Sequence, residues 1–333
     1  MTDAPDNNVR VSCSPHLCGN RTTRRIMIDV SIALLPACGM GIYTFGIRAL
    51  AVLVLCVASC VMSEFLFCLL MHKEQTVGDW SAVVTGLILG VNLPASVPLW
   101  LPLLGGAFAM VIVKLLFGGI GQNFMNPALA ARCFLLISFA GIMTAFPATY
   151  RTILPNATDA VSSATPLAAV RAGENPDWLR MLLDTHNGCI GESSPIAIAV
   201  GALYLLIRRV ITPRIPLIYL GSTIGLIALF QVFSGSGAFL TPGYLVAQLC
   251  GGGLLIGAFF MANDYTTSPI TPWGQVLYAL LLGLLTSLFR VFGSAAEGVS
   301  YAIIIGNCVV PLIESVTQPV PLTGRHGKGG KKG

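Results

Sequence analysis

The sequence predicts an all-α, polytopic membrane protein with about ten transmembrane helices, some of them short or broken. Of the 333 residues, 55% are hydrophobic and only 10% are charged, whereas soluble domains carry about 25% charged residues. The mean hydropathy is +0.79. Apolar runs recur along the chain with lengths close to the roughly 20 residues that a helix needs to cross a bilayer.

The predicted spans form two sets of five on either side of a long polar insertion. The first set covers approximately 26–46, 49–71, 81–93, 99–117 and 127–147, and the second covers 195–211, 215–233, 243–262, 275–292 and 298–315. The chain is therefore divided into an N-terminal segment (1–25), a first transmembrane half (26–147), an insertion (148–194), a second transmembrane half (195–315) and a basic tail (316–333).

The third span is too short to cross the hydrocarbon as a straight helix. Its apolar run from 81 ends just before Pro94 and is interrupted by Asn92, Pro94 and Pro98. Backbone broken at membrane depth survives only where protein or a polar cavity covers it. We therefore expect a half-helix or a re-entrant segment here.

A weak internal echo predicts an inverted 5+5 repeat. The segment Gly86–Gly90 (GLILG) of span three resembles Gly253–Gly257 (GLLIG) of span eight, and prolines follow both. Five spans separate the two copies, so they are expected to run in opposite directions, with a binding site at the broken helices.

Basic residues give the expected orientation in a bacterial cytoplasmic (inner) membrane. Arginines before the first span, and arginine and lysines in the tail, place both termini in the cytoplasm by the positive-inside rule. The insertion 148–194 then lies outside the cytoplasm. A basic tail of this kind is typical of membrane anchoring, and we expect no nucleic-acid partner.

Ionisable residues inside predicted spans are candidates for function. Glu64 lies within span two, about seven residues from its end, and two interpretations stay open: an ion path or a solvated helix end. Lys114, Arg132 and Arg290 are expected to extend their charges toward the membrane surface. The histidines and the ten cysteines show no strong metal-ligand spacing, so we predict no metal site.

The segment Asp159-Ala160-Val161-Ser162-Ser163-Ala164-Thr165 is small and Ser/Thr-rich within a hydrophobic chain. It resembles the acceptor motif Asp-x-x-Ser/Thr-Gly/Ser-Ala-Thr, on whose last Thr flavin transferases of the ApbE type attach FMN through a phosphoester. We therefore predict covalent FMN on Thr165. An acceptor hydroxyl belongs on an accessible loop, and Pro166 lacks the N–H that would tie this loop into regular structure. The rest of the modification motif is Asp159, Ser162, Ser163 and Ala164. The alternative is a plain polar connector.

Further stretches resemble one known family across nearly the whole chain. They are Val11–His16, Thr22–Val30, Gly121–Leu129, Gly257–Asp264 and Thr267–Pro272. The chain is similar to the NqrB/RnfD family, which includes the RnfD subunit of the ion-translocating Rnf electron transport complex. The resemblance implies a membrane electron-transfer subunit of a ferredoxin:NAD oxidoreductase complex that couples electron flow to Na⁺ or H⁺ translocation. It also implies two kinds of partner, a flavin transferase and the other flavin- and iron–sulfur-bearing subunits.

The resemblance also implies a noncovalent riboflavin in the membrane, for which Asn123, Asn126 and Asp264 are the candidate contacts. Asn123 and Asn126 are three residues apart and would share one face of a helix. Neutral amides can hydrogen-bond a flavin edge without burying a charge. The alternative makes Asn126 a helix cap with Pro127 at the first helical position, and Asp264 a solvated loop carboxylate.

Two other functions compete with electron transfer. A small-solute channel or transporter with inverted repeats would have the same spans and broken helices, but it would not need a flavin-attachment motif. A flavin-bearing scaffold without an ion path is the third hypothesis. No phosphate-binding loop or dinucleotide fingerprint is present, so NAD is expected to bind another subunit. This chain alone therefore carries no complete catalytic site.

Overall fold

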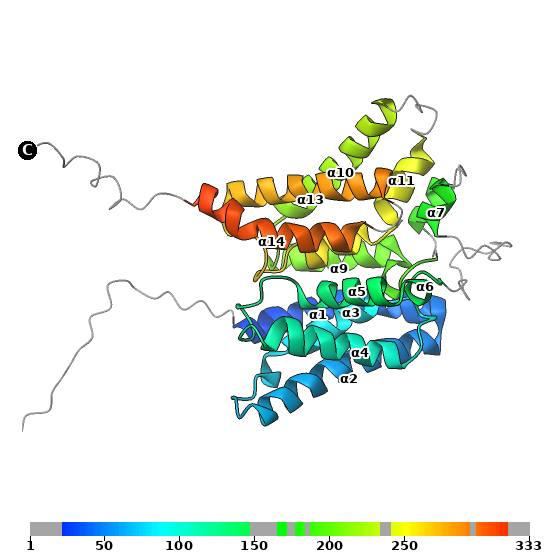
Figure 1. Cartoon of the computed structure of the whole chain (residues 1–333). Helices are drawn as coiled ribbons and strands as arrows, with labels where there is room; N and C mark the ends of the chain where they lie inside the picture. The colour runs from blue at the N-terminus through cyan, green and yellow to red at the C-terminus, as the bar shows by residue number, and fades with distance from the viewer. Residues whose placement is uncertain are drawn as a thin grey trace, which may run out of the picture.

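A computed structural model of the chain describes residues 22–146, 165–171, 177–183, 187–233, 241–293 and 298–318. Every regular element within these ranges is helical (Figure 1). The predicted motif residues Asp159, Ser162, Ser163 and Ala164, most of the N-terminal segment and most of the basic tail lie outside the described residues.

The helices follow the predicted order. The elements of the first half are α1 (Thr23–Phe45), α2 (Ile47–Leu70), η1 (Val77–Asp79), α3 (Ser81–Val91), α4 (Trp100–Ala107), η2 (Phe108–Leu115), α5 (Pro127–Ser138) and α6 (Ala140–Met143). The connecting elements are α7 (Pro166–Arg171), α8 (Trp178–Leu183) and η3 (Ile190–Glu192). Those of the second half are α9 (Pro195–Ile207), α10 (Arg214–Phe233), α11 (Pro242–Cys250), α12 (Leu254–Ile256), η5 (Gly257–Met261), α13 (Pro272–Phe292) and α14 (Val299–Thr317).

Ten apolar segments in the described residues match the ten predicted spans. The helices α1, α2, α10, α13 and α14 are long and apolar enough to cross a membrane, and α11 with Leu254–Met261 forms a sixth such span bent by 55°. The four shorter apolar helices are Ser81–Val91, Trp100–Leu115, Pro127–Ser138 and Pro195–Ile207. The predicted fold class, an all-α polytopic membrane protein, is confirmed.

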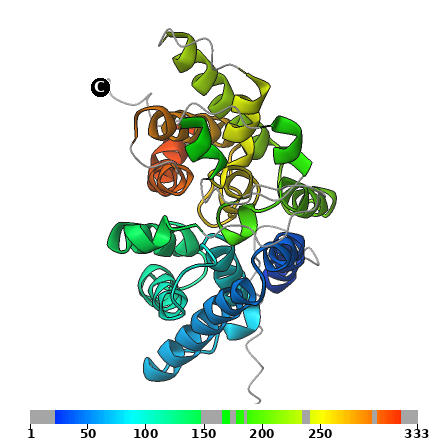
Figure 2. The same ribbon diagram turned by 90° about the vertical axis from the view of Figure 1, so that its right-hand side faces the viewer.

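The two halves pack as two groups of helices. Figure 2 separates the blue-to-teal helices of the first half from the yellow-to-red helices of the second. Helix α2 packs against α3 and α4, α10 packs against α13, and α1 meets α9 between the halves. Helices α1 and α9 run in opposite directions (Figure 1). This order is the one that an inverted repeat would give, and the repeat itself stays a prediction.

The break in each half has a local cause. Helix α3 has 11 residues, which span only about 16 Å, and Asn92, Leu93 and Val97 after it are buried in protein. In the second half the helix bends at Gly251–Gly253, where the echo segment starts, and the interruption predicted after the echo segment is also present, between Met261 and Pro272. Gly252 and Gly253 have φ of +64° and +69°, values that glycine adopts without a steric penalty. Pro269 lies in the loop after Met261, and Pro272 begins α13, which Thr271 caps.

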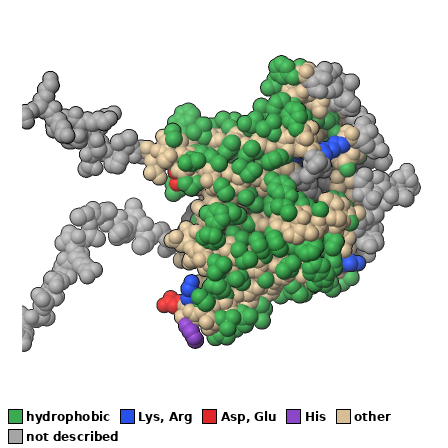
Figure 3. Space-filling view, viewed as in Figure 1, with side chains coloured by type: hydrophobic (Ala, Val, Ile, Leu, Met, Phe, Trp, Pro, Cys, Tyr) green, Lys and Arg blue, Asp and Glu red, His purple; other side chains and the backbone are tan. Residues whose placement is uncertain are grey.

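The described ends of the chain lie on one side of the bundle. The first residue of α1 and the last of α14 are at the left of Figure 1, and α7 is at the right. Hydrophobic side chains cover the flank between these two ends (Figure 3), as expected of a surface that faces lipid. The predicted cytoplasmic and extracytoplasmic sides therefore correspond to opposite ends of the structure, while the compartments stay a prediction.

Candidate functional site

All three predicted riboflavin contacts line one pocket. The pocket lies at the end of the bundle where α1 begins and α14 ends. Asn123, Asn126 and Asp264 line it together with Lys114. The space amounts to about 920 Å³ including the open mouth, a size typical of small-molecule sites. Its apolar wall consists mainly of Ile26, Met27, Val30, Val84, Ile88, Leu205, Val210, Ile211, Phe259 and Phe260.

Asn126 has a structural role and also faces the pocket. Its Oδ1 accepts hydrogen bonds from the backbone N–H of Ala128 at 3.0 Å and of Leu129 at 3.4 Å, and Pro127 is the first residue of α5. The helix-cap interpretation is therefore confirmed. Its Nδ2 has no hydrogen-bond partner among the described residues, so this amide donor is available to a ligand in the pocket.

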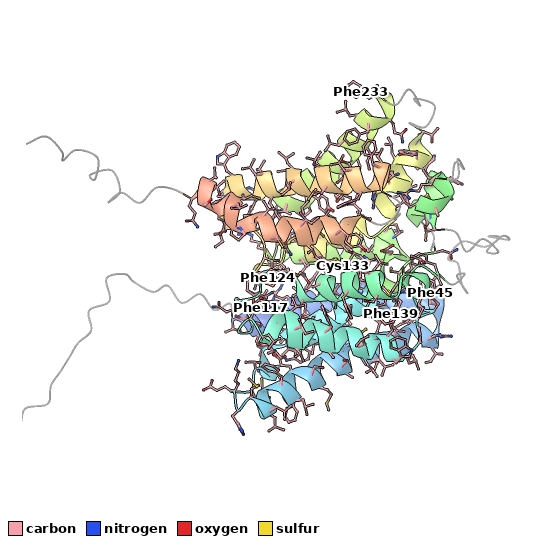
Figure 4. All side chains as sticks on the ribbon, viewed as in Figure 1. Phe45, Phe117, Phe124, Cys133, Phe139 and Phe233 are labelled. Carbon is pink, nitrogen blue, oxygen red and sulfur yellow. The ribbon has the colours of Figure 1, made fainter. Side chains whose placement is uncertain are left out.

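Asn123 reaches the pocket from a loop, so the prediction that it shares a helix face with Asn126 is wrong. Gly118, Gly119 and Gly121 have φ of +115°, +95° and +88°, and these turns fold the chain back before α5 begins. Two neighbouring rings pack against each other at this end of the bundle, those of Phe117 and Phe124 with centroids 4.8 Å apart (Figure 4).

Hydrogen bonds tie this loop to the loop between η5 and α13 in the second half. Nδ2 of Asn123 donates to Thr266 Oγ1 at 3.3 Å and to the carbonyl of Met125 at 3.2 Å. The Thr266 hydroxyl in turn donates to Asp264 Oδ2 at 3.1 Å. Asp264 is thus a half-buried turn residue at the pocket rather than a solvated carboxylate. Oδ1 of Asn123 has no partner among the described residues and is the acceptor that the pocket presents.

Partial burial among apolar side chains raises the pKa of Asp264 above its ordinary value, and hydrogen bonds from Thr266 and Thr267 oppose this shift. Burial disfavours the charged form of a carboxyl group, whereas donors stabilise it. Asp264 is therefore the one predicted pocket residue whose charge can vary. Such a group at a ligand edge can accept a hydrogen bond when ionised and donate one when protonated.

A buried ion pair joins the pocket to Glu64. Nζ of Lys114 lies 2.8 Å from Glu64 Oε1 and 2.5 Å from Ser81 Oγ, and the two charged side chains are 4% and 0% exposed. Lys114 belongs to the π-helical segment η2, a geometry that recurs at functional sites. The solvated-end interpretation of Glu64 is wrong. So is the expectation that Lys114 extends its charge to the membrane surface, because the carboxylate of Glu64 holds it inside.

Arg132 also stays inside, at the junction of the two halves. Its Nη1 donates to Asn92 Oδ1 at 3.1 Å and to Ser300 Oγ at 2.8 Å, and its Nη2 lies 3.4 Å from Cys189 Sγ. Glu192 Oε1 is 3.9 Å from Nη2. These partners come from the break after α3, from the segment around η3 and from α14, so one guanidinium connects both halves.

Arg290 is the third basic residue whose expected position is wrong. It donates to the backbone carbonyls of Gln248, Gly251 and Gly252 at the end of α11, where a helix leaves carbonyls without intrahelical partners. The break at Gly251–Gly253 is therefore stabilised from inside by a buried cation. A more exposed ion pair joins Arg208 to Asp29 at 3.2 Å, near the start of α1 and the end of α9.

Thr165 lies at the end of the bundle opposite the pocket, immediately before α7 (Figure 1). Its Oγ1 accepts a hydrogen bond from the Ala168 N–H at 3.3 Å. Pro166 does not keep this segment irregular as predicted. It is the first residue of α7, a position where the missing N–H is not needed. Among the described residues no acceptor takes the hydroxyl hydrogen of Thr165.

Helix α7 is docked against the broken helix of the second half. Leu167 is 2% exposed, and a Cβ added to Gly251 would lie 3.7 Å from the Leu167 Cβ. Nη2 of Arg171 donates to the carbonyls of Arg290 and Gly293 at 2.9 and 3.1 Å. The residue predicted to carry FMN therefore immediately precedes a short helix that packs on the membrane-spanning bundle.

Sequence reasoning found the three pocket residues and Glu64, but it missed what Lys114, Arg132, Arg290 and Glu192 do. A signal was present for the first three, because each is a basic residue within a predicted apolar span. Glu192 gave no such signal, since it stands in a polar insertion that the sequence places outside the membrane.

Comparison with known proteins gives a consistent result. Residues 10–323 match the sequence model of the NQR2, RnfD, RnfE family. The chain is 45% identical over 316 residues to a subunit of the Na⁺-translocating ferredoxin:NAD⁺ oxidoreductase complex of Acetobacterium woodii, covering 93% of this chain and 94% of the relative. It is 38% identical to the subunit of the same designation in the proton-translocating complex of Clostridium ljungdahlii, covering 94% and 96%. It is 33% identical to its counterpart in the ion-translocating oxidoreductase complex of Actinobacillus succinogenes, covering 93% and 96%.

Proposed function

Because the chain belongs to the NQR2, RnfD, RnfE family, we propose that it is the membrane electron-transfer subunit of a ferredoxin:NAD oxidoreductase complex that translocates Na⁺ or H⁺. Subunits of ion-translocating oxidoreductase complexes are its relatives over nearly the full length. The relatives include both a Na⁺- and a proton-translocating complex, so both ions are kept. The other subunits of the complex would supply and accept the electrons and bind NAD.

The first cofactor that we propose is FMN joined to Thr165 by a phosphoester. The motif Asp159–Thr165 supports this, and the Thr165 hydroxyl has the chemistry that the transferase needs. It receives only one long hydrogen bond, from Ala168, and its hydrogen has no acceptor among the described residues. A flavin transferase on the extracytoplasmic side would be the modifying partner.

Fluorescence on a denaturing gel tests this attachment. We expect a fluorescent band from the wild-type chain and none from Thr165→Ala, because the phosphoester needs the hydroxyl. Thr144→Ala is the matched control, since it removes an exposed threonine hydroxyl outside the motif and should keep the band. A fluorescent Thr165→Ala chain would reject the site.

The second cofactor that we propose is a noncovalent riboflavin in the pocket lined by Asn123, Asn126 and Asp264. The pocket suits an isoalloxazine because its walls are largely apolar, with Phe259 and Phe260 among them and a few polar groups in the lining. Asn126 Nδ2 and Asn123 Oδ1 offer one donor and one acceptor, and the flavin pyrimidine edge has both acceptors and a donor. Bound riboflavin would supply one- and two-electron redox chemistry, while the protein positions it and excludes water.

The two proposed flavin sites lie at opposite ends of the bundle. Thr165 is at the end that holds α7, and the pocket is at the end that holds the first residue of α1 (Figure 1). In a bacterial cytoplasmic membrane with both termini inside, the pocket would be near the cytoplasm and FMN on the outer side. This arrangement supports electron transfer across the membrane through this subunit.

Glu64 is proposed as part of the ion path. It is fully buried in a span and paired with Lys114, which supports function over a solvated helix end. Transport measurements separate the proposal from a flavin-bearing scaffold. Reconstituted complex carrying Thr165→Ala should lose electron-driven Na⁺ or H⁺ transport. Retained transport at the wild-type rate would contradict an electron-transfer role for the bound FMN.

A further inference from the structure

The ammonium of Lys114 is contacted by side-chain oxygen atoms, as a bound metal cation would be. Glu64 Oε1 and Ser81 Oγ lie 2.8 and 2.5 Å from Nζ. The Ser81 hydroxyl donates to Asp79 Oδ1 at 2.6 Å, and Thr76 Oγ1 donates to Glu64 Oε1 at 2.6 Å. Carboxylate and hydroxyl oxygens are also the ligands that hard cations prefer.

This cluster has one more negative than positive charge. Glu64 and Asp79 each contribute a carboxylate, and Lys114 contributes one ammonium, which contacts Glu64 directly and Asp79 only through the Ser81 hydroxyl. Oε2 of Glu64 is buried and has no hydrogen-bond partner among the described residues. The other titratable groups near the cluster are Cys60, Cys68 and Tyr265, and the exposed His72, Lys73 and Glu74 stand in the loop before Thr76. Among the described residues, only Lys114 lies within ion-pair distance of Glu64. The unpartnered oxygen therefore favours a further cation.

The cluster is connected in two directions. Thr76 is exposed at the end of the bundle, so a cation from water meets this hydroxyl next to Glu64. On the other side, Lys114 and Ser81 line the pocket that contains Asn123 and Asn126. A lysine carries its charge on a flexible four-carbon stem, so small rotations can move the ammonium from Glu64 toward the pocket.

We propose that Lys114 is a positioning residue that couples charge in the pocket to cation binding at Glu64. This inference rests on the proposed riboflavin site. An electron delivered by the flavin or iron–sulfur carriers of neighbouring subunits adds one negative charge to the pocket. The ammonium of Lys114 moves toward that charge, and Glu64 takes up one Na⁺ or proton from the aqueous end in its place. When the electron leaves, Lys114 returns to Glu64 and displaces the cation.

The charges balance at each stage of this exchange. The pocket gains one electron and one ammonium, while Glu64 exchanges the ammonium for one external cation. No covalent bond forms or breaks except an O–H bond if the cation is a proton. Electron transfer thereby favours cation uptake, because a buried carboxylate without a partner is strongly disfavoured.

The test is a redox titration of riboflavin bound to the full-length chain carrying Thr165→Ala, which removes the covalent flavin. The midpoint potential is measured as the NaCl concentration and the pH are varied separately. We expect the potential of the parent chain to rise with the coupled cation, approaching the 59 mV per tenfold change that links one cation to one electron. Lys114→Gln should abolish the Na⁺ dependence or, if the cation is a proton, reduce the pH slope by the part that Glu64 contributes, since flavin protonation and Asp264 keep the rest. Lys114→Arg should restore part of the lost slope.

The matched control is Lys73→Gln, which removes an exposed lysine at the same end of the bundle and should leave the dependence intact. If Lys114→Gln does not fold because Glu64 is left unpaired, the double variant Glu64→Gln/Lys114→Gln removes both charges and should also lose the dependence. A Na⁺ slope and a pH slope that both stay equal to those of the parent chain in either variant overturn the role of Lys114. A parent chain that binds no riboflavin instead overturns the pocket assignment, and the coupling falls with it.

Discussion

Asn126 caps a helix, and the proposed riboflavin site gives it a second role that substitution can separate. Its Oδ1 caps α5, and its Nδ2 faces the pocket. Replacing an Asn cap by Ala costs about 1 kcal/mol of stability, whereas Ser caps nearly as well as Asn. Loss of one hydrogen bond to a ligand costs about 0.5–1.5 kcal/mol, or roughly a twofold to tenfold loss of affinity.

We therefore expect different results from two variants. Asn126→Ala should lower the free energy of unfolding by about 1 kcal/mol and also weaken riboflavin binding. Asn126→Ser should keep most of the stability because the hydroxyl can still accept from Ala128, but it should weaken riboflavin binding by roughly the same twofold to tenfold. Thermal unfolding of the flavin-free chain and quenching of riboflavin fluorescence measure the two effects separately.

Ser194→Ala provides the matched control. Ser194 caps α9 through the Ala197 N–H, and a proline follows it as at Asn126, but it does not line the riboflavin pocket. This change should lower stability and leave riboflavin affinity unaltered. The reasoning is refuted if Asn126→Ser binds riboflavin as tightly as the unmodified chain, because Asn126 would then be a helix cap alone.

Two further changes test the break and the pocket carboxyl. Gly253→Ala should lower stability by about 1–2 kcal/mol, since an alanine would adopt a left-handed φ and its Cβ would lie 2.8 Å from Glu192 Oε1. Gly221→Ala in α10, whose added Cβ meets no atom within 4 Å, should be neutral or stabilising, and equal thermal stability of the two variants would contradict this account of the break. Asp264→Asn should raise the thermal stability at about pH 7 but not near pH 4. The raised pKa of Asp264 means that its contribution to stability is full below its unfolded pKa of about 3.9 and is lost as the pH rises through the folded value. Equal effects of Asp264→Asn at both pH values would show that its charge does not matter there.

Much of this architecture follows from the lengths of the apolar runs and from the prolines and capping residues at their ends. The ten spans were predictable because apolar length is a direct consequence of bilayer thickness. The cap at Asn126 and the start of α5 were predictable because Asn-Pro satisfies the first N–H groups of a helix. The short α3 followed from the prolines just after it.

The positions of the buried cations were not predictable from span positions alone. Lys114 and Arg290 can extend toward the membrane surface by length, yet tertiary partners hold them inside. Those partners are Glu64 for the lysine and the carbonyls of the α11 break for the arginine. The approach of Asn123 to the pocket likewise depended on glycine turns and on the contact with Thr266, which joins residues 143 positions apart.

The break in the second half shows the same limit. Prolines at 269 and 272 predicted an interruption after the echo segment, and the chain does leave the helix between Met261 and Pro272. The additional bend at Gly251–Gly253 was not predicted. A proline signals a helix start as readily as an end. Three consecutive glycines next to a buried arginine were the stronger indication, and the arginine could be placed there only by the fold.

The account depends above all on a flavin phosphate ester at the start of α7. Intact mass of the chain, purified from cells that contain an active flavin transferase, tests this directly, with fragmentation to locate the added group. The account predicts the mass of one FMN less one water, carried by the peptide that contains Thr165. A chain of unmodified mass, or FMN located on another residue, would contradict it.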